Sequence, residues 1–182
     1  SALLREEPLP APEEPELPER FDIDFTGVDF AYPSGKRALR EVTLHVPAGS
    51  TLALVGESGG GKSTLARLLA RFYDVDDGTV RIGGVDVRSI AADELSRIVA
   101  FVQQDEYIFA ASLLENIRVA RPGASDEEVR RAGERAQLAE VVAGLSHGWE
   151  SELPAGGGTL SGGQRQRIAV ARALLKDAPV VV

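Results

Sequence analysis

The segment GESGGGKST, Gly56 to Thr64, constrains the fold of this chain more than any other feature of the sequence. It satisfies the pattern G-x-x-x-x-G-K-[ST], and it lies between the apolar run Thr51 to Val55 and a stretch with leucines at helical spacing. Strand, glycine-rich loop and helix in this order predict an α/β core with a phosphate-binding loop. We therefore expect the chain to bind a nucleoside triphosphate.

Each residue type in this loop has a chemical reason. Glycines allow backbone N–H groups to turn toward phosphate oxygens, and the following helix adds positive potential at its start. Lys62 can reach the β- and γ-phosphates, the Ser63 hydroxyl can bind Mg²⁺, and Thr64 can donate near the α-phosphate. The predicted nucleotide-binding residues of the loop are Gly56, Glu57, Ser58, Gly59, Gly60, Gly61, Lys62, Ser63 and Thr64.

The remaining pattern predicts strands before the loop and helices after it. Val28, Phe30 and Tyr32 alternate at period two, as do Val42, Leu44 and Val46, and the pair Gly83-Gly84 between two short apolar runs indicates a hairpin. The run from Ile98 to Val102 is expected to be a further buried strand. SLLE and SDEE are capping-box patterns, which predict helices from about Leu113 and Asp126, and the apolar run at 178–182 predicts a strand.

A second motif, LSGGQRQR from Leu160 to Arg167, lies roughly a hundred residues beyond the loop. Ser161 is a helix N-cap residue, and the two glycines after it leave N–H groups open at a positive helix end, so we expect a second anion site. The motif resembles the signature sequence of ATP-binding cassette (ABC) proteins, and the resemblance extends from Phe21 to Val182. FAASLLENI and the signature helix most resemble cassettes fused to an exporter-type membrane domain.

This resemblance implies several further assignments. Tyr32 matches the residue that stacks on adenine, and Gln104 matches the glutamine that contacts Mg²⁺ and the attacking water, with Gln103 as a neighbouring alternative. Lys62 and Gln104 are the implied catalytic residues, and Ser63 and Gln104 the implied metal contacts. In this family two cassettes pack head to tail, so that the signature residues Ser161, Gly162, Gly163 and Gln164 complete the ATP site of the partner.

The resemblance also implies a domain plan. Residues 1–20 hold six Glu, two Arg and five Pro, and from this composition we interpret them as an acidic, extended linker, with a disordered tail without a role as the alternative. Residues 21–103 form the nucleotide-binding core with an antiparallel β subdomain. The helical signature subdomain covers 104–165, and 166–182 return to the core. In the family, the strand after the signature helix ends at a Mg²⁺-binding aspartate, followed by a catalytic glutamate and a histidine. Because the sequence ends before these positions, we expect this fragment to hydrolyse ATP poorly.

The implied function is an ATP-hydrolysing domain that powers an exporter-type transporter from the cytoplasmic face of the membrane. Its implied partners are a second cassette and a transmembrane domain fused upstream. An alternative is a degenerate cassette that holds ATP as structural glue in a heterodimer. Soluble ABC ATPases of DNA repair or translation form a third class, but a net charge of −8 argues against a nucleic-acid partner. The sequence does not identify the cargo or the direction of transport.

Overall fold

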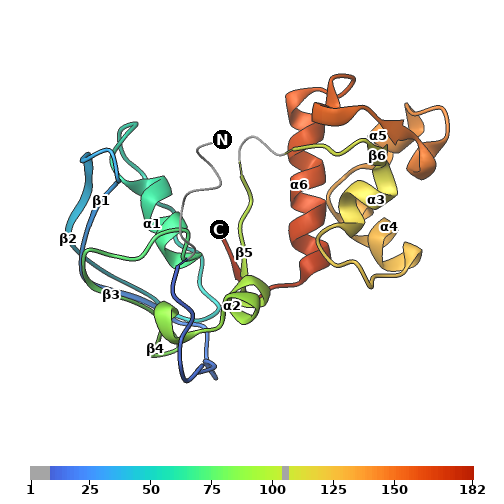
Figure 1. Ribbon diagram of the computed structural model, residues 1–182. Coiled ribbons are helices and arrows are strands. Elements are labelled where there is room, and N and C mark those ends of the chain that lie inside the picture. The colour runs from blue at the N-terminus through green and yellow to red at the C-terminus, as the bar shows by residue number, and fades with distance from the viewer. Residues whose placement is uncertain (1–8, 104–106) are drawn as a thin grey trace. The chain divides into compact units, whose positions relative to one another are not determined.

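The computed structural model describes residues 9–103 and 107–182, which form two compact units that meet between Val99 and Ala100. Figure 1 shows a sheet with helices beside it in the first unit and a group of helices in the second. The architecture is mixed α/β, as expected. Each unit has buried apolar residues of its own.

The first unit contains a four-stranded antiparallel sheet with the order β2-β1-β3-β4. Ile23 lies opposite Val46 on one side and Ile82 on the other. Val28, Phe30 and Val80 are buried on the core face, because alternate residues of a strand point to the same side. The antiparallel strands and the Gly83-Gly84 hairpin confirm the predictions for this part. The bounds are β1 Ile23–Ala31, β2 Arg37–Val46, β3 Asp77–Ile82 and β4 Val85–Asp86.

Residues 9–20 of the acidic, proline-rich segment contact this unit without forming a helix or a strand. The Glu16 N–H donates to Ser89 O at 2.8 Å, and Arg71 Nη2 donates to Pro10 O at 2.8 Å. The backbone at Gly83 approaches Arg20 so closely that a Cβ there would lie 2.1 Å from the Arg20 carbonyl oxygen. The described part of the segment is therefore held by specific contacts at three points.

The segment Thr51 to Val55 was expected to be a strand, and this prediction is wrong. It belongs to no strand in the described part of the chain, and Val55 is 90% exposed. A β-strand is stabilised by ladder hydrogen bonds to a neighbour and not by its own apolar sequence. None of the described strands pairs with residues 51–55, so the apolar pattern alone did not produce a strand.

The predicted strand from Ile98 to Val102 is much shorter than expected. Ile98 ends the helix α2 (Ala92–Ile98), and only Val99–Ala100 forms the strand β5. The predicted strand near the end of the chain is present as β8 (Val180–Val181), which pairs with β5. Val182 donates its N–H to Ala100 O and accepts from the Val102 N–H, which is the bonding pattern of parallel strands.

The second unit is a helical group around an apolar core. Ile117, Val129, Leu138 and Ile168 are fully buried at its centre, and α6 packs against both α3 and α4. Its elements are β6 Ala111–Ser112, α3 Leu113–Arg118, α4 Asp126–Arg135, α5 Ala139–Ala143, β7 Glu152–Leu153 and α6 Gly162–Lys176, with 3₁₀ turns at Gly148–Glu150 and Ala155–Gly157. No helix in the described part of the chain has both the length and the apolar character needed to span a bilayer.

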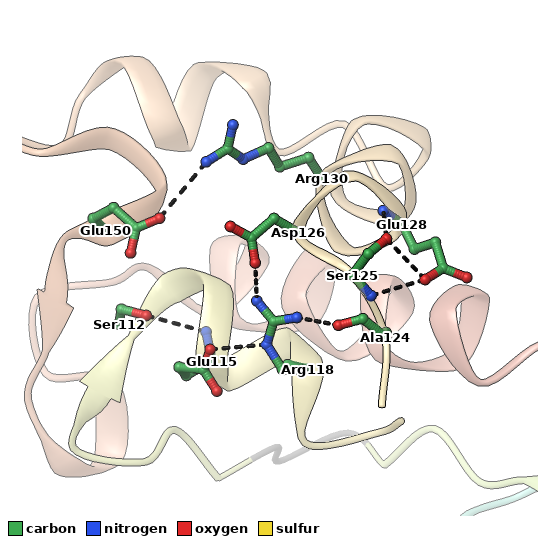
Figure 2. A network of polar contacts seen from close by, with 9 residues as sticks. All are labelled: Ser112, Glu115, Arg118, Ala124, Ser125, Asp126, Glu128, Arg130 and Glu150. Carbon is green, nitrogen blue, oxygen red and sulfur yellow. Dashed lines mark hydrogen bonds and ion pairs between the residues drawn. The ribbon is translucent and has the colours of Figure 1, made fainter. Parts of the chain in front are cut away.

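Serine residues start three of these helices, as predicted. Ser112 accepts from the Glu115 N–H, and Ser125 forms a full capping box with Glu128. Figure 2 shows how Arg118 joins the two helix starts, because it donates to Glu115, to the Ala124 carbonyl oxygen and to Asp126. These contacts fix the turn between α3 and α4.

Candidate functional site

The glycine-rich loop of the first unit is built on the neighbouring strand β2. Gly61 has a φ of 84°, in the left-handed region that favours glycine. A Cβ at Gly61 would lie 2.6 Å from Leu39 Cδ2 and 2.9 Å from Ala38 O. The loop thus passes so close to β2 that only glycine fits, and the sequence motif alone did not reveal this contact.

Lys62 closes the loop by contacting its first residues. Its Nζ donates to Gly56 O at 2.8 Å and to Glu57 O at 2.7 Å. These two carbonyl oxygens hold the ammonium group beside the loop backbone, where an anion placed in the loop would meet a full positive charge. Gly56 to Gly60 are exposed to solvent, so a ligand can reach the loop.

The helix α1 (Lys62–Leu69) begins directly after Gly61. Among the described residues, no side chain caps this helix start, and its first turn contains no acidic residue. The positive end of the helix is therefore not neutralised by its own first turn. Ser63 is exposed and Thr64 is buried. The exposed Ser63 hydroxyl is an oxygen donor of the kind that Mg²⁺ prefers.

Tyr32 lies in an aromatic cluster immediately after β1. Its ring contacts Phe30 and Tyr73 edge to face, with ring centroids 5.0 and 5.4 Å away. Its hydroxyl lies 2.9 Å from Thr64 Oγ1 and accepts from Arg67 Nη1 at 3.2 Å. Of the predicted site residues, Tyr32 and Thr64 are therefore in direct contact. Tyr73 and Arg67 were not predicted, because these contacts join residues far apart in the sequence.

The signature segment begins the helix α6 in the second unit. Ser161 accepts from the Gln164 N–H at 3.2 Å, and Gln164 Oε1 accepts from the Ser161 N–H at 2.8 Å, which makes a complete capping box. Ser161, Gly162 and Gly163 are exposed, whereas Gln164 is half-buried. The predicted N-cap is confirmed. Gln104 lies outside the described residues.

The far end of α6 is fixed to the start of α3 through Arg172. Its Nε donates to Asn116 O at 2.7 Å, and its Nη1 donates to Tyr107 O at 2.9 Å. Asn116 is itself buried and bonds to the backbone at Phe109 and Ser112. Arg172 therefore connects the signature helix to α3 and to the segment before it.

With both motifs located, comparison with known proteins decides the family. Residues 39–182 match the family model described as ABC transporter. The chain belongs to this family. The P-loop NTPase fold of an ABC cassette is likewise shown by a solved structure, a bacterial Atm1-family ABC exporter with ATP bound, which has a TM-score of 0.91 at 36% identity and covers 99% of this chain and 32% of that one.

Curated proteins similar to this cassette have names that describe transporters. The uncharacterized ABC transporter ATP-binding protein YknV of Bacillus subtilis (strain 168) is 43% identical over 161 residues, which are 88% of this chain and 27% of that protein. The mycobactin import ATP-binding/permease protein IrtA of Mycolicibacterium thermoresistibile is 46% identical over 160 residues, which are 88% of this chain and 18% of that protein. The cassette thus spans less than a third of the length of these relatives.

Proposed function

We propose that this cassette binds ATP with Mg²⁺ and that the polypeptide carrying it hydrolyses ATP to drive transport across a membrane. The observation that carries this proposal is the loop itself, in which Lys62 Nζ lies against the carbonyl oxygens of Gly56 and Glu57 at the uncapped start of α1. Membership in the ABC transporter family supports the same conclusion.

Lys62 and the loop backbone are the groups that bind the phosphates in this proposal. An arriving triphosphate replaces the two carbonyl oxygens as the partner of the ammonium group, which exchanges neutral acceptors for charged ones. The N–H groups at the start of α1 add donors at fixed positions. Because phosphoryl transfer depends on positioning and charge stabilisation, a preformed cation at this place favours both binding and reaction.

Other residues are proposed to contact Mg²⁺ and the adenine ring. Ser63 would hold Mg²⁺ through its exposed hydroxyl, and Gln104 is proposed as a second contact to the metal and the attacking water. Bound Mg²⁺ neutralises developing charge on the phosphates. Tyr32 presents a ring on which adenine can stack, and stacking of this kind contributes about 1–3 kcal/mol per base.

The signature residues Ser161, Gly162, Gly163 and Gln164 are proposed to contact ATP held by a second cassette. The exposure of Ser161, Gly162 and Gly163 at the positive end of a long helix supports this role. A transmembrane domain in the same polypeptide is the other proposed partner, because a relative is named an ATP-binding/permease protein. Such a domain would place the cassette at the cytoplasmic face of the membrane. The relatives include proteins named for import and for efflux.

ATP hydrolysis by the full-length polypeptide tests the proposal. Lys62→Ala should lower kcat by about 10²–10³-fold, the usual loss when one charge-stabilising group of a transition state is removed. Arg81→Ala, which removes an exposed positive charge from β3 of the same unit, is the matched control and should leave the rate unchanged. Equal rates for the unsubstituted protein and Lys62→Ala would refute the proposed role of the loop.

A further inference from the structure

Three side chains connect the surface of α1 to the phosphate loop through hydrogen bonds. Arg67 Nη1 lies 3.2 Å from the Tyr32 hydroxyl, which lies 2.9 Å from Thr64 Oγ1. Arg67 and Thr64 are both on α1, and Tyr32 lies immediately after β1, 32 residues away from Thr64 in the sequence. Thr64 is 5% exposed and follows Lys62 by two residues. These hydrogen bonds therefore reach the first turn of α1, the helix that follows the phosphate loop.

The chemistry of the three groups favours one donor order for these hydrogen bonds. A guanidinium group has only donors, so the Tyr32 oxygen must accept from Arg67. The phenolic hydroxyl then has one hydrogen left to donate, and Thr64 Oγ1 is its partner at hydrogen-bond distance. If Thr64 accepts that hydrogen, its own hydroxyl hydrogen stays available for another acceptor. Either hydroxyl of the Tyr32–Thr64 pair can be the donor. Because the Tyr32 oxygen already accepts a hydrogen from Arg67, the order in which Tyr32 donates to Thr64 is favoured.

The position of Tyr32 is fixed independently of this chain. Phe30 and Tyr73 pack edge to face on its ring, with centroids 5.0 and 5.4 Å away. The Tyr32 N–H also donates to Lys36 O at 3.0 Å, and the preceding Ala31 N–H donates to Asp76 Oδ2 at 2.7 Å. Because the ring and the backbone are both held, the hydroxyl is presented to Thr64 in one place.

We propose that Arg67 and Tyr32 form a hydrogen-bond relay that directs the Thr64 hydroxyl hydrogen toward a phosphate oxygen of the bound nucleotide. This inference rests on the proposed function, since it assumes that the loop beside Thr64 binds phosphate. Arg67 is then a positioning residue, and Tyr32 contributes its hydroxyl in addition to its ring. The relay connects the surface that would receive the base with the loop that would receive the phosphates.

The opposite direction makes an opposite prediction. If Thr64 donated to Tyr32, removal of the phenolic hydroxyl would release the Thr64 hydrogen for the phosphate, and nucleotide affinity would stay equal or increase. In the proposed direction the same removal leaves Thr64 without its donor, and affinity falls. The sign of the change caused by Tyr32→Phe therefore distinguishes the two arrangements.

The test is equilibrium binding of adenylyl imidodiphosphate and of adenosine to the full-length polypeptide. Tyr32→Phe keeps the ring and should weaken binding of the triphosphate analogue by about 3- to 10-fold, as expected for one neutral hydrogen bond. Adenosine, which lacks phosphates, should bind both proteins equally. Arg67→Met should weaken analogue binding by about 2- to 5-fold and add no further loss in the Tyr32→Phe background, because both variants interrupt the same chain.

Arg81→Met removes an exposed positive charge from β3 and is the matched control for Arg67→Met. Equal or tighter binding of the analogue by Tyr32→Phe would overturn the relay, and so would additive losses in the double variant. If Lys62→Ala abolished binding in the same experiment, the proposed function would stand without the relay. A matching loss for adenosine would also overturn it, because the effect would then lie in the ring. If the unsubstituted protein bound no analogue at all, the proposed function would fail and the relay with it.

Discussion

The two helix starts that carry the motifs differ in how their backbone N–H groups are satisfied. The helix α1 begins after Gly61 in a left-handed conformation, with no side-chain cap among the described residues. The helix α6 begins after Ser161, which forms a reciprocal capping box with Gln164. Both starts are positive helix ends, but only α6 supplies its own hydrogen-bond partners.

This difference indicates which helix start can bind an anion without a second cassette. The uncapped start of α1, with Lys62 held beside it, leaves backbone N–H groups that an anion can accept from. The capped start of α6 is already stable in one unit and presents Ser161 to solvent in a fixed conformation. We therefore expect the first to bind nucleotide by itself and the second to act on nucleotide held elsewhere.

Glycine substitutions in the two motifs should have very different effects on stability. Gly61→Ala places a Cβ 2.6 Å from Leu39 Cδ2 in a residue with positive φ, so it should lower the free energy of unfolding by about 2–4 kcal/mol. Gly163→Ala has nothing within 4 Å of the new Cβ, and alanine favours a helix over glycine by less than about 1 kcal/mol. Denaturant unfolding of the purified chain measures both.

The matched pair makes the result interpretable. Similar unfolding free energies for Gly61→Ala and the unsubstituted chain would show that the phosphate loop does not rest on β2. A large loss for Gly163→Ala would show that the signature segment is as tightly packed as the phosphate loop, which would remove the difference between the two helix starts.

Lowering the pH should have a smaller effect, which should differ between two capping boxes of the second unit. In α4 the box uses Glu128, whose pKa is lowered by hydrogen bonds from the backbone N–H and then the hydroxyl of Ser125. In α6 the corresponding residue is Gln164, which does not titrate. A carboxyl group with a lowered folded pKa stabilises the fold above its ordinary pKa of about 4.3 and loses that effect as the pH falls through the folded value.

The Ser125 backbone amide should therefore shift in NMR spectra as the pH falls below about 4.3, whereas the Ser161 amide should not follow the same titration. Glu128→Gln, which gives α4 the same type of box as α6, should abolish the response at Ser125. The comparison of the two boxes would be wrong if the Ser125 amide titrated with a midpoint at or above the ordinary glutamate pKa.

The parts of the fold that depend on neighbouring residues were predictable from sequence. Ser112, Ser125 and Ser161 each start a helix as expected, because an N-cap bonds to an N–H only three residues away. The hairpin at Gly83-Gly84 is local for the same reason. The phosphate loop and the signature were also recognisable, since each motif is a short run with fixed spacing.

The features that depend on distant partners were not predictable. Thr51 to Val55 has the composition of a strand, but a strand requires a neighbour, and none of the described strands pairs with it. Tyr32 lies immediately after β1, whereas its partners Arg67 and Tyr73 lie on and after α1, so no local sequence pattern predicts these contacts. Leu39 beneath Gly61 is a further example, because it is buried by a loop that lies on another part of the chain.

Crosslinking of the two motifs across a pair of cassettes tests whether the signature segment of one cassette lies beside the phosphate loop of another. The 182 residues contain no cysteine, so single cysteines can be placed by Ser58→Cys in one tagged copy and Ser161→Cys in another, with other cysteines of the full-length polypeptide replaced. Saturating Mg²⁺ and adenylyl imidodiphosphate should produce a crosslinked pair, and Lys62→Ala in the first copy should prevent it. Ser125→Cys, at a cap of the same type, should give no crosslink. Failure of Ser58→Cys and Ser161→Cys to crosslink with nucleotide, or equal crosslinking with Lys62→Ala, would contradict the account.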